Sequence, residues 1–149
     1  MKILVTGNGG GSSAHELVAK VLDKLHDDFG VDEIVRGADT SIDSVDRATD
    51  AWAKENGVAQ RIFEVIWKDN STSTPSWGDS VFRRNVRMLA ANPALIVLFD
   101  GVESASPFLE LRLVKRPVLV VEETGVVVTR GSGWGEFVRA RLAELRVSA

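Results

Sequence analysis

The chain has 149 residues and a net charge of −3 at pH 7, and 44% of its residues are hydrophobic. These values are ordinary for one soluble globular domain, and the acidic balance argues against general nucleic-acid binding. The absence of cysteine excludes disulfides and thiolate metal sites, and two histidines argue against a histidine metal centre, so we expect neither a metal nor another cofactor. No apolar run approaches the roughly 20 residues of a membrane span, and no signal peptide is recognisable, so we expect a cytoplasmic protein.

Apolar periodicity predicts strands and helices that alternate along the chain. The expected strands are residues 3–5, 32–36, 59–67, 93–101 and 116–123, with a short further strand after Gly125. The expected helices are residues 14–29, 43–56, 79 or 80 to 91, and 104–115, with a terminal amphipathic helix that bears Phe137, Val138, Leu142 and Leu145. Residues 68–79 are predicted to form a polar loop.

Local signals support the helix ends and the fold class. Ser13 and Glu16 have the spacing of a capping box, and Gly30 and Gly57 stop the first two helices. The alternation of elements predicts an α/β protein, a three-layer α/β/α Rossmann-like domain with a mostly parallel sheet of five or six strands. We predict a single domain over residues 1–149, with residues 122–149 as a C-terminal β-α extension.

The first strand leads directly into a glycine-rich segment, TGNGGGSSAHE at residues 6–16. In parallel α/β sheets, ligands bind beyond the carboxyl ends of the strands, where bare amides at a helix N-terminus attract anions. We therefore predict a phosphate or nucleotide site formed by Gly7, Asn8, Gly9, Gly10, Gly11 and Ser12. The alternative is a tight strand-to-helix turn without a ligand, since neither a complete dinucleotide fingerprint nor a Walker motif is present.

Four segments in order carry a family resemblance: MKILVTG, VRGADTSIDSVDRATDAWAKENGV, RRNVRML and PALIVLFDG. Together they resemble the SLOG superfamily of Rossmann-like nucleotide-binding proteins, specifically the subfamily related to YspA. The resemblance covers about residues 1–121, and its strongest matches are Trp52-Ala53 with Gly57 and Arg84-Asn85 with Met88. Relatives include the cytokinin-activating phosphoribohydrolases and the DNA-processing protein DprA. The resemblance implies a nucleotide-like small-molecule ligand and a homodimer, because dimers are usual among these relatives.

The second glycine segment of the subfamily, GGA-x-G-x-D, is only partly preserved. Gly37 remains from it, and its aspartate aligns either with Asp43 or with Asp46, which lies six residues before Trp52. We favour Asp43, because the SIDS segment resembles the loop-to-helix entry of the family. The resemblance implies that this aspartate contacts the ribose or base, and the alternative is that it only caps a helix.

A later family motif, GG-x-GT, aligns with residues 100–104 and implies ligand contacts by Gly101 and Ser104. Here Glu103 replaces the glycine that faces the phosphate. A carboxylate about 5 Å from a phosphate costs on the order of 3 kcal/mol at an effective dielectric near 20, so this second phosphate cradle is weakened. The glutamate that acts in the phosphoribohydrolases aligns with Pro107, which is neither acid nor base. Their hydrolysis is therefore not carried over, and any catalytic residue is unknown.

Charge is unevenly distributed along the chain. Residues 1–74 hold 8 basic and 13 acidic side chains, whereas residues 75–149 hold 10 basic and 8 acidic ones. The resemblance places Arg84 and Asn85, early on the third helix, near the ligand, where an arginine would clamp a phosphate. The alternative is that Arg83, Arg84 and Arg87 form a solvated face of the helix.

Three tryptophans and one histidine allow further readings. Trp52 is predicted to lie in the core, and Trp67 and Trp77 either anchor the polar loop or stack on a base. His15 follows the glycine-rich segment in the first helical turn, but no acid or base partner for it is evident.

These observations lead to one main function and two alternatives. The main expectation is binding of a nucleotide or nucleotide-derived ligand without catalysis, to sense or sequester a signal, which would suit bacterial or phage defence or counter-defence. The first alternative is a nucleotide or nucleoside N-glycosidase with relocated acids, such as Glu103 or Glu110. The second is a degenerate scaffold for protein-protein contacts.

Overall fold

The computed structural model describes residues 1–7, 14–66, 77–100 and 115–148. The strands are β1 (Lys2–Gly7), β2 (Glu33–Gly37), β3 (Ala59–Phe63), β4 (Leu95–Asp100), β5 (Pro117–Glu122) and β6 (Val127–Gly131). The helices are α1 (Ala14–Phe29), α2 (Val45–Asn56), α3 (Trp77–Ala90) and α5 (Trp134–Ser148). Among the described residues, no helix is both long and apolar enough to span a membrane.

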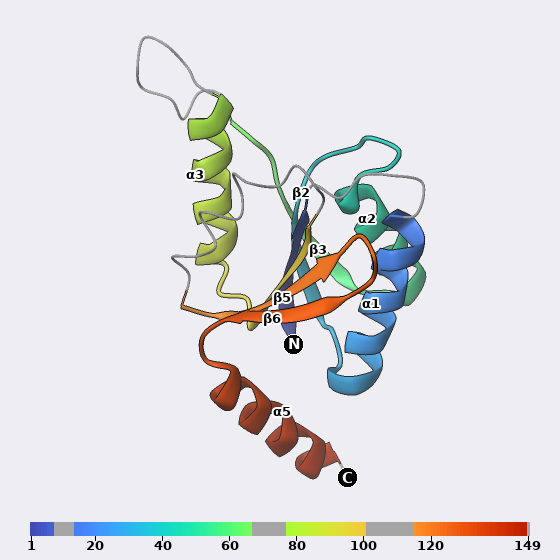
Figure 1. Cartoon of the computed structure of the whole chain (residues 1–149), viewed down its shortest axis with the longest axis vertical. Coiled ribbons are helices and arrows are strands. Elements are labelled where there is room, and N and C mark those ends of the chain that lie inside the picture. Colours follow the sequence, from blue (N-terminus) through green and yellow to red (C-terminus); the bar gives the residue numbers. More distant parts are fainter. Residues whose placement is uncertain (8–13, 67–76, 101–114, 149) are drawn as a thin grey trace.

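The strands form one sheet in the order β3-β2-β1-β4-β5-β6. All neighbouring strands pair in parallel except β5 and β6, which pair antiparallel. Helices α1 and α2 lie on one side of this sheet and α3 on the other (Figure 1). The predicted Rossmann-like α/β fold with a mostly parallel sheet is confirmed, and β1 and β4 are its two central strands.

Two apolar clusters cover the two faces of the sheet, because successive strand residues point to opposite sides. Ile3 and Val5 of β1 pack with Val18 and Leu22 of α1, on the side that also holds α2. Leu4, between them in the sequence, packs in a second cluster with Met88 of α3. The central strands are apolar on both faces for this reason, as expected of buried parallel strands.

Helix α2 is fixed at both ends and along its buried face. Its N-cap is Ser44, whose hydroxyl accepts a hydrogen bond from the Arg47 amide, and Gly57 ends it in the left-handed conformation. Trp52 is 3% exposed, and its indole Nε1 donates to Asp23 Oδ1 of α1 at 2.8 Å. The predicted core position of Trp52 is confirmed. The same residue also ties the two helices together.

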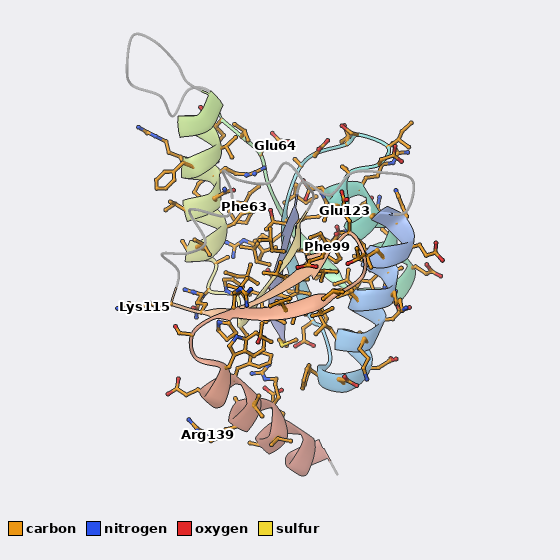
Figure 2. The ribbon with its side chains drawn as sticks, in the orientation of Figure 1. Phe63, Glu64, Phe99, Lys115, Glu123 and Arg139 are labelled. Carbon is orange, nitrogen blue, oxygen red and sulfur yellow. The ribbon has the colours of Figure 1, made fainter. Side chains whose placement is uncertain are left out.

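Two element boundaries differ from the sequence prediction. Strand β3 ends at Phe63 and does not continue to Trp67, because its one neighbour, β2, ends at the paired residue Gly37. Helix α3 begins at Trp77, two or three residues earlier than predicted, since Gly78 is tolerated within its first turn. The helix expected at 104–115 lies outside the described residues. Figure 2 shows Phe63 between α3 and the sheet, with Glu64 following it.

The C-terminal part adds an edge strand and a helix. Gly131, at the end of β6, has φ 76°, and a Cβ there would lie 2.0 Å from the Arg116 carbonyl oxygen, so a side chain is excluded. Helix α5 begins three residues later and anchors its first turn with Phe137, whose ring meets Phe29 of α1 edge to face. Gly131, in the glycine-rich segment before α5, is therefore required by the backbone of this connection.

Candidate functional site

The sheet reverses its order of strand addition between β1 and β4. From β1 the chain adds β2 and β3 on one side, and from β4 it adds β5 and β6 on the other. In α/β sheets of this kind, the crevice beyond the carboxyl ends of the two central strands is the usual ligand site. Gly7 is the last residue of β1 and Asp100 is the last residue of β4, so both central strands end at this edge of the sheet.

Gly7 is required by the neighbouring strand. It pairs with Phe99 of β4, and a Cβ on Gly7 would lie 2.2 Å from the Phe99 carbonyl oxygen. No real Cβ approaches backbone that closely, so close packing against β4 by itself requires a glycine at this position. The other residues predicted for the phosphate site, Asn8 to Ser12, lie outside the described residues.

Gly37 is required for a different reason, because two charged side chains converge on it at the end of β2. A Cβ on Gly37 would lie 2.6 Å from Arg84 Nη1 and 2.9 Å from Asp46 Oδ2. Arg84 comes from α3 and Asp46 from the first turn of α2, which lie on opposite sides of the sheet. Arg84 Nε also donates to Asn85 Oδ1 at 3.1 Å. The structure thus brings together three predicted site residues: Gly37, Arg84 and Asn85.

The aspartate in this group is Asp46. Its Oδ2 accepts a hydrogen bond from the Asp39 amide at 3.0 Å. Burial raises the pKa of Asp46 above its ordinary value, although the Asp39 amide and the charges of Arg84 and Arg36 act in the opposite direction. Asp43, which we favoured from the sequence, is exposed and precedes the N-cap Ser44, so it is not the cap of α2 either.

Arg36, the residue before Gly37, is 6% exposed and has its guanidinium occupied. Its Nε donates to Gln60 Oε1 at 2.7 Å, its Nη1 to the Gly37 carbonyl at 2.8 Å, and its Nη2 to Asp50 Oδ1 at 3.2 Å. Gln60 Nε2 donates to the same Asp50 oxygen. Arg36 therefore ties the last part of β2 to the beginning of β3 and to α2.

Residues 1–69, which include β1, α1, β2, α2 and β3, match the YspA, cpYpsA-related SLOG family. This N-terminal part, a little under half of the chain, is similar to that family. No curated protein and no solved structure gives a significant match to the chain. Similarity to the SLOG family suggests a nucleotide-related ligand in general. The SLOG match ends before α3, so the family resemblance of Arg84 and Asn85 remains a prediction.

His15 links two segments beside this candidate site. Its Nε2 lies 2.9 Å from the Ile42 carbonyl oxygen, so this nitrogen carries the proton and donates. The contact ties the first turn of α1 to the loop between β2 and α2. We therefore interpret His15 as a positioning residue. Among the described residues, no group of three or more histidines and carboxylates is arranged to hold a metal ion.

Several predicted positions lie outside the part of the chain that the structure describes. These are Gly101, Ser104, Glu103, Pro107, Glu110 and Trp67, together with the side chain of Trp77. Their expected roles remain predictions. Sequence reasoning gave too little weight to Asp46, although its distance to Trp52 was the available signal. It missed Asp39 and the bracing by Arg36, which depend on strand pairing.

Asp46 and Asp50 lie one turn apart on α2, and their pKa values move in opposite directions. Hydrogen bonds from Lys54 and Gln60 lower the pKa of Asp50, whereas burial raises that of Asp46, from the same ordinary value of 3.8. The stability that Asp46 contributes is thus fully present below pH 3.8 and is lost as pH rises through its folded pKa. The contribution of Asp50 is present above pH 3.8 and is lost as pH falls through its folded pKa.

Asparagine variants at these two positions should therefore change the pH dependence of stability in opposite senses. For Asp46→Asn, the wild-type advantage in the free energy of unfolding should shrink as pH rises above 3.8. For Asp50→Asn, the advantage should shrink as pH falls below 3.8. Urea unfolding of the three proteins over a pH series measures both effects, and parallel profiles for the two variants would contradict the opposite assignments.

Proposed function

We propose that this protein binds a nucleotide or nucleotide-derived small molecule at the carboxyl edge of its sheet and performs no chemistry on it. The observation that carries the proposal is the position of Gly7 and Gly37 at the ends of adjacent strands, beside the reversal between β1 and β4. The SLOG match over residues 1–69 supports a ligand of this class.

In this proposal each part of the edge has a separate task. The amides of Gly7 to Ser12, together with Gly101 and Ser104, are expected to hold a phosphate. Asp46 contacts the sugar or base in place of the exposed Asp43, and Arg84 with Asn85 closes the site from the side of α3. The convergence of Arg84 and Asp46 on Gly37 supports this division, because it places a cation and an anion within reach of one small ligand.

Binding without turnover fits sensing or sequestration of a nucleotide signal, since Pro107 stands at the position that aligns with the glutamate of the hydrolytic relatives. A role in defence or counter-defence in a bacterium or phage would use the same property. This extension rests on analogy with the family alone, whereas the binding proposal rests on the residues at the sheet edge.

Isothermal titration calorimetry tests the binding proposal with a panel of ribonucleoside mono-, di- and triphosphates, NAD, ADP-ribose and cyclic nucleotides. We expect at least one compound to bind, and Arg84→Gln to weaken that binding by about tenfold or more, because a charge-assisted hydrogen bond contributes about 1.5–3 kcal/mol. Arg139→Gln is the matched control, since Arg139 lies on α5 and points into solvent away from the sheet (Figure 2).

Two outcomes would contradict the proposal. If no compound of the panel binds, the proposed nucleotide binding is contradicted. Release of a free base or sugar phosphate during incubation, detected by chromatography, would show that the protein is an N-glycosidase and would overturn binding without chemistry.

A further inference from the structure

Strand β6 forms an edge of the sheet that none of the described helices covers. It pairs with β5 alone, and no described helix lies in front of it in Figure 1. Val126, just before the strand, and Val127, its first residue, are 53% and 47% exposed. An open edge offers backbone donors and acceptors to another strand, and β-branched residues favour such pairing. Residues 1–69, which match the SLOG family, do not include β6, so that match does not account for this edge.

The pairing of β6 with β5 determines which backbone groups of β6 point outward. The Glu122 amide donates to the Val126 carbonyl at 2.8 Å, so these two residues form a hydrogen-bonded pair. Because such pairs alternate with non-hydrogen-bonded pairs along an antiparallel ladder, the amides and carbonyls of Val127 and Thr129 point to the free edge. There the Thr129 carbonyl accepts a hydrogen bond from Nη1 of neighbouring Arg130 at 3.2 Å, which is an exposed contact.

A second copy of the chain is complementary to this edge. A two-fold axis through Val128 runs β6 antiparallel to its copy and sets Val127 opposite the partner's Thr129, and Thr129 opposite the partner's Val127. Both pairs join residues whose backbone groups point outward, so each pair can exchange both of its hydrogen bonds. Val128 faces the partner's Val128 in the closer, non-hydrogen-bonded pair between them. All these side chains are β-branched, and cross-strand pairs of this kind stabilise a sheet.

Charge complementarity favours the same register. Glu122, Val126 and Arg130 lie on one face of the sheet, because side chains alternate along a strand and Glu122 is paired with Val126. In the two-fold arrangement Arg130 lies opposite the partner's Val126, and the partner's Glu122 follows on the next strand. Arg130 and Glu122 are both exposed and carry opposite charges. The Arg130 guanidinium can then leave the Thr129 carbonyl, which gains an amide of the partner, and turn to this carboxylate.

The opposite edge of the sheet, β3, is less suited to pairing with its own copy. Arg61 is the central residue of β3, so a two-fold pairing centred on this strand sets two arginines against each other, which is destabilising. The backbone just after β3 is also engaged, because Arg87 of α3 donates to the Glu64 carbonyl at 2.8 Å. We therefore assign the second copy to β6.

We propose that two copies of this protein associate through antiparallel β6 strands and form one continuous sheet. Val127 and Thr129 of each copy supply the backbone hydrogen bonds, and Arg130 pairs with the partner's Glu122. The edge where we propose that the ligand binds lies at the carboxyl ends of β1 and β4, so this association does not depend on the proposed function.

Sedimentation velocity over a series of protein concentrations tests the association. The mass should rise from that of one 16.2 kDa chain toward twice this value as concentration increases. Thr129→Pro removes an outward amide without removing a bond to β5, and proline is tolerated at such edge positions. It should weaken association by about tenfold or more. Thr129→Val is the matched control, because it keeps the amide and the β-branched shape, and it should associate like the wild type.

Charge variants test the register. Arg130→Glu should weaken association by about fivefold or more, because it sets two carboxylates against each other at both ends of the seam. Combining it with Glu122→Arg should restore association by exchanging the two charges. Arg139→Glu is the control on α5, where the side chain points into solvent, and it should associate like the wild type (Figure 2). Circular dichroism shows whether each variant is folded, and the charge variants decide the question if Thr129→Pro is not.

Three outcomes would overturn the proposal. The first is the mass of a single chain at every concentration of wild-type protein. The second is undiminished association of a folded Thr129→Pro protein, which would place the contact on another surface. The third is association of Arg130→Glu equal to that of the wild type, or a double variant that does not recover, since either contradicts the pairing of Arg130 with the partner's Glu122.

Discussion

Replacing Gly7 with alanine is expected to destabilise the protein by about 3 kcal/mol or more. The added Cβ would lie 2.2 Å from the Phe99 carbonyl oxygen, and both atoms belong to backbone in the two central strands. Neither strand can move without disturbing the apolar clusters on both faces, so the strain is not relieved by a side-chain rotation. For a chain of this length, such a loss lowers Tm by about 6–12 °C, which thermal unfolding monitored by circular dichroism measures.

Gly135→Ala is the matched control for this prediction. Gly135 lies in the first turn of α5, where a Cβ would meet Arg139 Nη1 at 3.7 Å, an ordinary contact. Alanine there is expected to leave stability unchanged or raise it by about 0.5–1 kcal/mol. A Tm for Gly7→Ala equal to that of Gly135→Ala would show that β1 and β4 do not pair as closely as described.

Gly37→Ala is expected to impair ligand binding strongly and stability only slightly. The atoms that an added Cβ would meet are Arg84 Nη1 and Asp46 Oδ2, the tips of flexible side chains, which can move aside. Their displacement separates the cation and anion that define the site, while the sheet remains as it is. We expect a loss of about tenfold or more in affinity for the ribonucleotide that binds most tightly, with a change of about 1 kcal/mol or less in the free energy of unfolding.

Calorimetry and urea unfolding of the same Gly37→Ala preparation measure both quantities. Gly135→Ala again serves as the control and should bind with wild-type affinity. Affinity retained by a folded Gly37→Ala protein would place the ligand elsewhere on the sheet edge. A loss of stability as large as that of Gly7→Ala would show that Arg84 and Asp46 are held rigidly as part of the core.

Much of the fold follows from local signals in the sequence. Gly30 and Gly57 mark helix ends because both adopt the left-handed conformation after a helix, and the alternation of Ile3, Leu4 and Val5 between two cores follows from their apolar character. The sequence predicted a longer β3 because Val65, Ile66 and Trp67 are apolar and follow Phe63 after a single charged residue, Glu64. The boundary is set by the end of β2, with which β3 pairs. The sequence of β3 itself carries no information about where β2 ends.

The candidate site was predictable only in part, for the same reason. Gly37, Arg84 and Asn85 were singled out by family resemblance, and the structure brings them together. The choice between Asp43 and Asp46 depends on which turn of the chain faces Gly37, which is a matter of three-dimensional placement. Gly7 looked like part of a ligand loop, whereas its lack of a side chain is explained by the carbonyl of a residue 92 positions later in the chain.

The antiparallel course of β6 has a practical consequence for handling the protein. Because β6 returns the chain to the amino edge of the sheet, α5 leaves from the side opposite Gly7 and Gly37, near the bonds that hold the Met1 amino group to Gly30 and Asp32 (Figure 1). A tether or fluorophore attached after α5 would therefore leave the carboxyl edge of the sheet, where we propose that the ligand binds, unobstructed. A fusion to the Met1 amino group would disrupt those bonds, so immobilisation for surface-based binding assays is best made through the C-terminal helix.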